Sequence, residues 1–317
     1  MTVLTNTLDS SSSLRRRIPW HIPVFLFPAF LVYGLFSAFP LLDTLRLSLY
    51  GDTAVGERHF VGLSNFMTLL LDPTWADGFW NAMGNNLKFF LIHMVVQNPI
   101  GLLLDALLSL PGLRFAKSYR TLIFLPTLLS VVIVGFIWQL ILSPLWGVSE
   151  SMLRLVGLVD WFQPWLGQES SALVTLAFIS VWQYVGIPMM LIYAALLAIP
   201  EDIVEAAVVD GASPWRVFWN IKLPLIYPTL GLVTILTFVG NFNAFDLIYA
   251  VKGALAGPNF SSDILGTYFY RTFFGYQSQL GSATMGAAVA TIMFLVILLG
   301  VLGYFYLVQR RLQRYEL

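Results

Sequence analysis

No cysteine occurs among the 317 residues of the sequence, and charged residues make up only 11% of it. The absence of cysteine excludes disulfides and thiolate metal sites. The scarcity of charge excludes a soluble globular protein, in which about 25% of residues are charged. Hydrophobic residues make up 58% of the chain, and the mean hydropathy is +0.77. This composition predicts an all-α, polytopic membrane protein surrounded by lipid.

Motifs of nucleotide binding and metal-dependent catalysis are also missing. The sequence contains no GxxxxGK[ST] phosphate loop, no HExxH and no DxD, the patterns that hold phosphates or metal ions at such sites. The net charge of zero gives no sign of nucleic-acid binding. We therefore expect no catalytic residue, no metal site and no cofactor in this chain, and no nucleic acid as a partner.

The chain does contain six long hydrophobic stretches, each near the ~20 residues that a spanning helix needs. They are predicted at Val24–Leu42, 87–110, Thr121–Leu142, 170–200, Leu223–Phe245 and from about Ala283 onwards. Polar loops are expected at 51–82, 143–170 and 250–271. The expected organisation is an N-terminal tail (1–21), a six-helix transmembrane domain (22–309) and a basic C-terminal tail (310–317).

Basic residues are concentrated in four of the segments that flank these spans. They are Arg15, Arg16 and Arg17; Arg114, Lys117 and Arg120; Arg216 and Lys222; and Arg310, Arg311 and Arg314. Larger loops on the other side carry Arg46, Arg58, Lys88, Arg154, Lys252 and Arg271. Six spans put both termini on one side, and the positive-inside rule assigns that side to the cytoplasm.

One cytoplasmic segment, Glu205–Pro224, is rich in helix and turn signals. Pro200 suits the start of a short helix, and Asp210-Gly211 signals a turn in which glycine adopts a positive φ. Ser213-Pro214 then predicts an N-cap and the start of a second helix. The expected structure is a loop (200–224) of two short helices joined at a glycine elbow. By physics alone, this hairpin lies on the inner leaflet or binds a protein.

Charge favours the protein partner. A helix that binds the inner leaflet is usually basic, because the lipids there are anionic. This loop carries four acidic residues against two basic ones: Glu201, Asp202, Glu205 and Asp210 against Arg216 and Lys222.

The sequence pattern of this loop resembles a known family. It reads EAA, three residues, Gly, nine residues, and then Ile-x-Leu-Pro, at 205–207, 211 and 221–224. This is similar to the signature loop of the permease subunits of binding-protein-dependent ATP-binding cassette importers. GLSNF (62–66), FLPTLLS (124–130), AIPEDIVEAAVVDGA (198–212), FNAFDLIY (242–249) and TYFYRTFF (267–274) resemble the sugar-importer branch, near the maltose-type and glycerol-phosphate-type permeases.

The resemblance implies a multi-pass protein of a bacterial or archaeal inner membrane that forms half of a pathway for a carbohydrate. It implies a second homologous permease, as a heterodimer, an extracytoplasmic solute-binding protein and a cytoplasmic ATPase dimer that binds the ATP and Mg. It also implies that the loop docks on the ATPase. The coupling residues would be Glu205, Ala206, Ala207, Asp210, Gly211, Ile221, Leu223 and Pro224.

Polar residues within uncharged spans are candidates for the substrate pathway, because polar groups are costly in a bilayer. Three clusters at helical spacing are Thr127 and Ser130; Ser180, Gln183 and Tyr184; and Thr237 and Asn241. Hydroxyl, amide and aromatic groups without fixed charge suit a neutral sugar. The alternative is that they form hydrogen bonds between helices, as small polar residues in membranes often do.

Other polar residues receive structural interpretations. His93 has no second ligand at metal spacing, Asn85 and Asn86 are expected to cap the second span, and Asp246 to be paired or solvated near the outer interface. Two other functions stay open: a membrane-embedded transferase, which needs acidic pairs or metal ligands, and a secondary transporter, which usually shows intramembrane carboxylates and repeated halves.

Overall fold

The computed structural model describes residues 21–309 except 53–56, 111, 147 and 278–279. The predicted tails 1–21 and 310–317 therefore lie outside the described residues, apart from residue 21. The chain forms two compact units, divided after Thr44. The first contains α1 (His21–Tyr33), a π-helical turn η1 (Gly34–Ala38) and the start of α2 (Phe39–Leu47). These helices form an apolar stretch of 26 residues, 22–47, which confirms the first predicted span.

After the end of α2, the second unit has helices and strands where the sequence predicts a polar loop. A short antiparallel hairpin, β1 (Tyr50–Asp52) and β2 (Arg58–Phe60), precedes α3 (Ser64–Leu71) and α4 (Pro73–Ile92). The predicted loop 51–82 is therefore wrong. The Asp72 carboxylate caps α4 by accepting a hydrogen bond of 2.9 Å from the Thr74 amide, which holds the pKa of Asp72 below its usual range.

Helix α4 runs on through η2 (His93–Gln97) and α5 (Asn98–Leu108), so one apolar stretch covers 73–108. The second span is confirmed but begins earlier than predicted, because its first turns bury Ala76, Phe79 and Ala82 at three-residue intervals. Asn85 and Asn86 do not cap this helix. Both are buried within it, and the Asn86 amide donates to the backbone oxygen of Asn241.

The third predicted span, Thr121–Leu142, is broken. Helix α6 (Ala116–Phe124), continued by the 3₁₀ turn η3 (Leu125–Leu128), meets α7 (Val131–Ile141) at an angle of 97°. The backbone is extended at Leu129 and Ser130, with ψ of 144° and 132°. The freed Leu129 carbonyl accepts a hydrogen bond of 3.1 Å from Gln183, which is why the break is tolerated in this setting. Two short helices, α8 (Val148–Leu155) and η4 (Val159–Trp161), occupy the expected loop 143–170.

The fourth span is α9 (Ala172–Tyr184) with α10 (Gly186–Leu197). Loop 200–224, called the coupling loop after its expected role, follows as α11 (Glu201–Val209), α12 (Pro214–Val217), η5 (Phe218–Lys222) and α13 (Leu223–Leu225). The fifth span is α14 (Tyr227–Phe242) with α15 (Asp246–Lys252), and the sixth is α17 (Ala283–Tyr304) with η6 (Phe305–Gln309). All three spans are confirmed. The expected loop 250–271 is wrong in part, because α15 ends at Lys252 and α16 (Leu265–Phe274) begins inside it.

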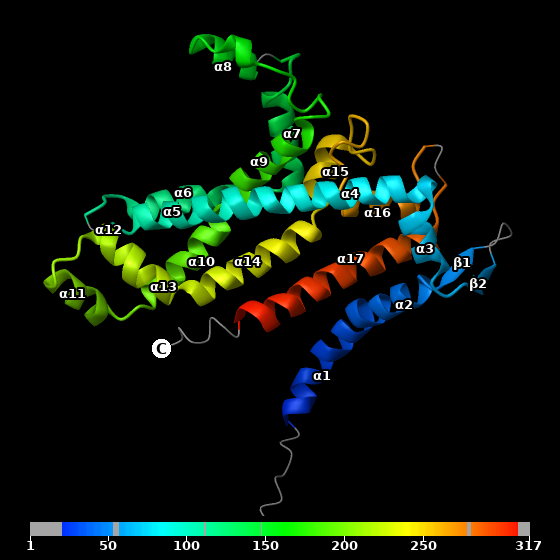
Figure 1. Cartoon of the computed structure of the whole chain (residues 1–317), viewed down its shortest axis with the longest axis horizontal. Coiled ribbons are helices and arrows are strands. Elements are labelled where there is room, and N and C mark those ends of the chain that lie inside the picture. The colour runs from blue at the N-terminus through cyan, green and yellow to red at the C-terminus, as the bar shows by residue number, and fades with distance from the viewer. Residues whose placement is uncertain (1–20, 53–56, 111, 147, 278–279, 310–317) are drawn as a thin grey trace, which may run out of the picture. The chain divides into compact units, whose positions relative to one another are not determined.

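Among the described residues, five helices are long and apolar enough to cross a membrane, and the bent pair makes a sixth if it counts as one span. The expectation of an all-α, polytopic membrane protein is thereby confirmed. In the second unit, α11 and α12 lie at one end, and α3 and α16 lie at the other (Figure 1). The long helices between these two ends separate the proposed coupling loop from α3 and α16, as a transmembrane arrangement requires.

Candidate functional site

The coupling loop has the elbow that its sequence predicts. Gly211 has a φ of +81°. Its amide donates to the oxygen of Val208, and the amide of Ala212 donates to that of Ala207, both at 3.0 Å. This pair of bonds is a Schellman motif, which satisfies the last carbonyls of α11. The Ser213 hydroxyl then accepts from the Arg216 amide at 3.4 Å and caps α12.

The two faces of the loop differ in exposure. Glu205, Ala206, Asp210 and Gly211 are exposed, together with Val208 and with Val209, which is 87% exposed. The other predicted coupling residues face the bundle: Ala207 is buried, and Ile221, Leu223 and Pro224 are half-buried. The exposed face is therefore acidic and apolar, which suits a protein surface better than anionic lipid.

The inner face of the loop is packed firmly into the helical bundle. Phe218 is 5% exposed and lies in a hydrophobic cluster with Ala106, Ile192, Leu196, Ile226 and Val233. These residues come from η5, α5, α10 and α14, together with Ile226 directly before α14, so the loop is packed directly onto three spans. A close-packed interior transmits displacement, because its side chains cannot deform independently.

A buried ion pair lies among the same spans. Arg120 Nε is 3.4 Å from Asp105 Oδ1, and both side chains are almost fully buried. The Arg120 guanidinium also stacks over the Tyr193 ring at 3.8 Å and donates to the Leu108 oxygen at 2.9 Å. The pair joins α5, α6 and α10. The sequence pattern does not reveal this pair, because Asp105 and Arg120 lie on opposite sides of a predicted loop.

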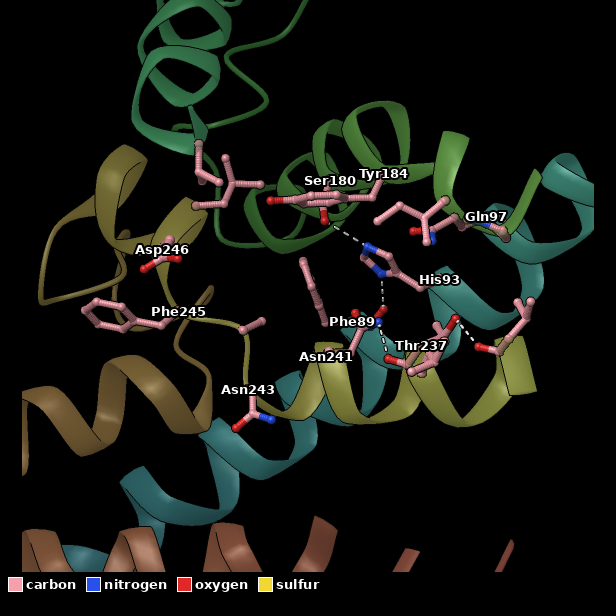
Figure 2. A pocket seen from close by; sticks show the side chains of 18 of the residues that line it. Phe89, His93, Gln97, Ser180, Tyr184, Thr237, Asn241, Asn243, Phe245 and Asp246 are labelled. Atoms are coloured by element: carbon pink, nitrogen blue, oxygen red, sulfur yellow. Dashed lines mark hydrogen bonds between the residues drawn. The ribbon is translucent and has the colours of Figure 1, made fainter. Parts of the chain in front are cut away.

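A cavity of about 460 Å³ lies between α4, η2, α9, α10, α14 and α15 (Figure 2). Four predicted pathway residues line it: Ser180, Tyr184, Thr237 and Asn241. The lining also includes residues that were not predicted for the pathway: Phe89, His93, Gln97, Gly240, Asn243, Phe245 and Asp246. The structure therefore brings together two of the three predicted clusters, from helices that are far apart in the sequence.

Three predicted pathway residues do not line this cavity. The Thr127 hydroxyl donates to the Gln183 backbone oxygen at 2.9 Å, and the Gln183 side chain donates to Leu129 across the break. Ser130 lies at the break and is exposed. For Thr127 and Gln183, these bonds favour the alternative of hydrogen bonding between helices.

Polar groups in the cavity wall form two short networks (Figure 2). His93 Nδ1 lies 2.8 Å from the Phe89 oxygen, and His93 Nε2 lies 2.9 Å from Ser180 Oγ. Asn241 Nδ2 donates to the Thr237 oxygen at 2.7 Å. His93 therefore has the hydrogen-bonded, structural position expected of it, and this position lies in the wall of the cavity. Its sequence neighbours gave no signal of this, because Ser180 is 87 residues away.

The cavity offers hydroxyl, amide and aromatic groups. Its described lining residues include no lysine or arginine, and Asp246 is its one acidic member among them. No group of three or more histidine, aspartate and glutamate side chains in the described part of the chain could hold a metal ion. The wall is thus suited to hydrogen bonding and stacking with a neutral polar molecule rather than to metal coordination.

Comparison with known proteins identifies the family. Residues 97–314 match the family described as binding-protein-dependent transport system inner membrane component. The chain belongs to this family. It is 32% identical over 277 residues to the probable ABC transporter permease protein YurN of Bacillus subtilis (strain 168), covering 87% of this chain and 91% of YurN. It is 30% identical over 288 residues to the lactose transport system permease protein LacF of Rhizobium radiobacter, covering 91% and 95%.

The fold agrees with that assignment. A solved structure of a bacterial alginate ABC transporter, in complex with an alginate pentasaccharide-bound periplasmic protein, contains a chain that aligns with a TM-score of 0.77 at 24% identity. The alignment covers 92% of this chain and 95% of that one. This inner membrane component is therefore a multi-pass membrane protein that serves transport, and the matched region includes both the coupling loop and most of the cavity.

Proposed function

We propose that this chain forms one half of the translocation pathway of an ATP-binding cassette importer for a neutral carbohydrate. An extracytoplasmic binding protein delivers the cargo, a second homologous permease completes a heterodimeric pathway, and a cytoplasmic ATPase dimer docks on loop 200–224. The observation that carries the proposal is the combination, in one helical unit, of this exposed acidic loop with a cavity whose described lining residues offer hydroxyl, amide and aromatic groups and include no lysine or arginine.

The cargo class follows from the cavity wall and from relatives. Ser180, Thr237 and Asn241 provide hydroxyl and amide groups, and Tyr184 and Phe245 provide aromatic rings. A phosphorylated or carboxylated sugar would require cationic partners, which the described lining residues lack. LacF is named for lactose, and another relative, MalF of Thermococcus litoralis, is named for trehalose and maltose. A neutral mono- or disaccharide fits both lines of support.

The power source lies outside this sequence. The chain carries no phosphate loop, so ATP and Mg are bound by the partner ATPase, and the permease has no catalytic activity of its own. Both termini and loop 200–224 lie in the cytoplasm. η6, where the described chain ends, packs beside α14, and α14 begins directly after the coupling loop.

The test is reconstitution of the complete importer in proteoliposomes with ATP inside. The components are this chain, the second permease, the ATPase and the binding protein loaded with lactose, maltose or trehalose. We expect uptake only when all four proteins and ATP are present. Uptake by the purified chain alone, driven by an ion gradient, would contradict the proposal in favour of a secondary transporter. Chemical conversion of the sugar by the chain would instead support a membrane-embedded transferase.

A further inference from the structure

His93 is an ionisable side chain that the proposed transport mechanism does not otherwise use. It is 3% exposed, lies in the π-helical turn η2 and lines the cavity. Its ring packs on that of Phe89, with the centroids 4.5 Å apart. Both ring nitrogens have a partner, so the position of the proton on the ring can be inferred from the chemistry of those partners.

The partner of Nδ1 decides the tautomer. The Phe89 carbonyl oxygen, 2.8 Å away, can only accept a hydrogen bond, so Nδ1 carries the proton and donates it. In a neutral imidazole, Nε2 then has no proton and can only accept. The Ser180 hydroxyl, 2.9 Å from Nε2, must therefore donate to it. With its one proton directed at His93, Ser180 presents only oxygen lone pairs to the cavity.

Asn241, which lines the same cavity, carries a second acceptor. Its Nδ2 donates to the Thr237 oxygen at 2.7 Å, and the opposite orientation of the amide would bring two oxygens together. The remaining atom, Oδ1, is buried, and no hydrogen-bond partner for it occurs among the described residues. An orphaned buried acceptor costs free energy unless a ligand or water satisfies it. The cavity wall thus carries two acceptors without a proton to donate.

We propose that His93 is a positioning residue that fixes the hydrogen-bond polarity of the cavity. Because His93 engages the Ser180 proton, Ser180 acts as an acceptor, as Asn241 does. Both residues therefore accept hydrogen bonds that hydroxyl groups of the cargo donate. This inference rests on the proposed function and deepens it, because it defines which atoms of the carbohydrate are read. An imidazolium at position 93 would donate from both nitrogens and would turn the Ser180 proton into the cavity, reversing the polarity.

The tautomer can be measured without knowing the cargo. The importer is assembled with this chain labelled with ¹⁵N-histidine, and its imidazole signals are recorded by solid-state NMR in membranes. The chain has three histidines, His21, His59 and His93, and the signal lost in the His93→Gln variant is that of His93. We expect a neutral ring protonated at Nδ1, with Nε2 accepting a hydrogen bond that disappears in Ser180→Ala. A ring protonated at Nε2, or one unaffected by Ser180→Ala, would overturn the inference.

The consequence for the cargo is tested by import of deoxyfluoro sugars. The probe is whichever of lactose, maltose and trehalose the wild type imports fastest, with analogues in which fluorine replaces one hydroxyl at a time. Fluorine keeps the compact shape but cannot donate. Rates are compared at saturating loaded binding protein, so that affinity for that protein does not contribute. For at least one hydroxyl position we expect the wild type to import the fluorinated analogue about five times more slowly than the natural sugar, because one hydrogen bond is lost.

The variants separate positioning from packing. We expect the discrimination against the fluorinated analogue to disappear in Ser180→Ala and in His93→Phe, because in the latter Ser180 is free to donate. The double variant should lose no more discrimination than either single variant. His93→Gln offers an acceptor oxygen and should restore part of the discrimination. His59→Phe, at an exposed position on β2, is the control and should behave as wild type. Equal discrimination in all variants would overturn the inference. If the wild type imported none of the sugars, the proposed function would be refuted, and the NMR result alone would decide the positioning role of His93.

Discussion

Gln183 shows how a single residue differs from its sequence-based interpretation. Its spacing from Ser180 and Tyr184 predicts one shared face, yet residues 183 and 184 are separated by 100° around a helix. Ser180 and Tyr184 line the cavity, whereas Gln183 is fully buried and bonds to the broken third span. Spacing therefore identified a polar face but could not show which of its residues line the cavity and which bond to the third span, because the break at Leu129 lies 54 residues away in the sequence.

We expect Gln183→Leu to destabilise the protein by about 1–3 kcal/mol, because the Leu129 carbonyl at the break would lose its donor. The measurement is thermal unfolding of the purified protein in detergent, followed by near-ultraviolet circular dichroism. Gln163→Leu, at an exposed position before the same span, serves as the control. Equal unfolding temperatures for the two variants would contradict this account of the break.

At the scale of elements, local signals predicted the coupling loop well and the outer segments poorly. The Asp210-Gly211 turn and the Ser213 cap depend on neighbouring residues, and the structure has both. The start of α4 and the whole of α16 were missed, because their polar residues are satisfied by hydrogen bonds and ion pairs inside the protein. Asp263 pairs with Arg271 at 2.6 Å inside the protein, and burial raises the pKa of Asp263 although Arg271 opposes this shift. Such pairing makes polar sequence compatible with a buried helix.

The elbow gives a prediction with a closely matched control. Gly211→Ala forces alanine into a φ of +81°, which costs about 1 kcal/mol or more in the left-handed region. We expect normal membrane insertion and reduced stimulation of ATP hydrolysis by the loaded binding protein. Gly112 has a φ of +83°, and a Cβ at either glycine would meet no atom within 4 Å. Gly112→Ala therefore carries the same strain outside the loop, and an equal loss of coupling in both variants would contradict the role of the elbow.

The packing of the loop predicts a second effect. Phe218→Ala removes a buried ring from the cluster on α5, α10 and α14 and should destabilise the protein by about 3 kcal/mol. The neighbouring Trp219→Ala, at a side chain 39% exposed, should cost less. Thermal unfolding measures the stability, and binding-protein-stimulated ATP hydrolysis measures the coupling. If Phe218→Ala left both unchanged, the loop would not be rigidly attached to the spans.

At the scale of the whole molecule, composition and charge bias predicted the membrane class and the spans, and family membership agrees with them. The positive-inside rule adds a prediction of sidedness that is easily measured, because the chain has no cysteine. A single cysteine at exposed Ser213, in the loop, should react with a membrane-impermeant maleimide only after the cells are opened. A cysteine at exposed Asp77, on α4, should react in intact spheroplasts. The reverse pattern would contradict the topology.

The central claim is that the energy for transport enters through loop 200–224, and Glu205 tests it most directly. The measurement is ATP-driven uptake of a neutral disaccharide into proteoliposomes that contain the assembled importer, together with the affinity of the permease pair for the ATPase. We predict that Glu205→Ala inserts normally, binds the ATPase roughly thirtyfold more weakly, as expected for about 2 kcal/mol lost from a charge pair, and imports slowly. The control is Glu169→Ala, at an exposed position outside the loop, and should import normally. Normal ATPase binding and uptake by Glu205→Ala would contradict the account.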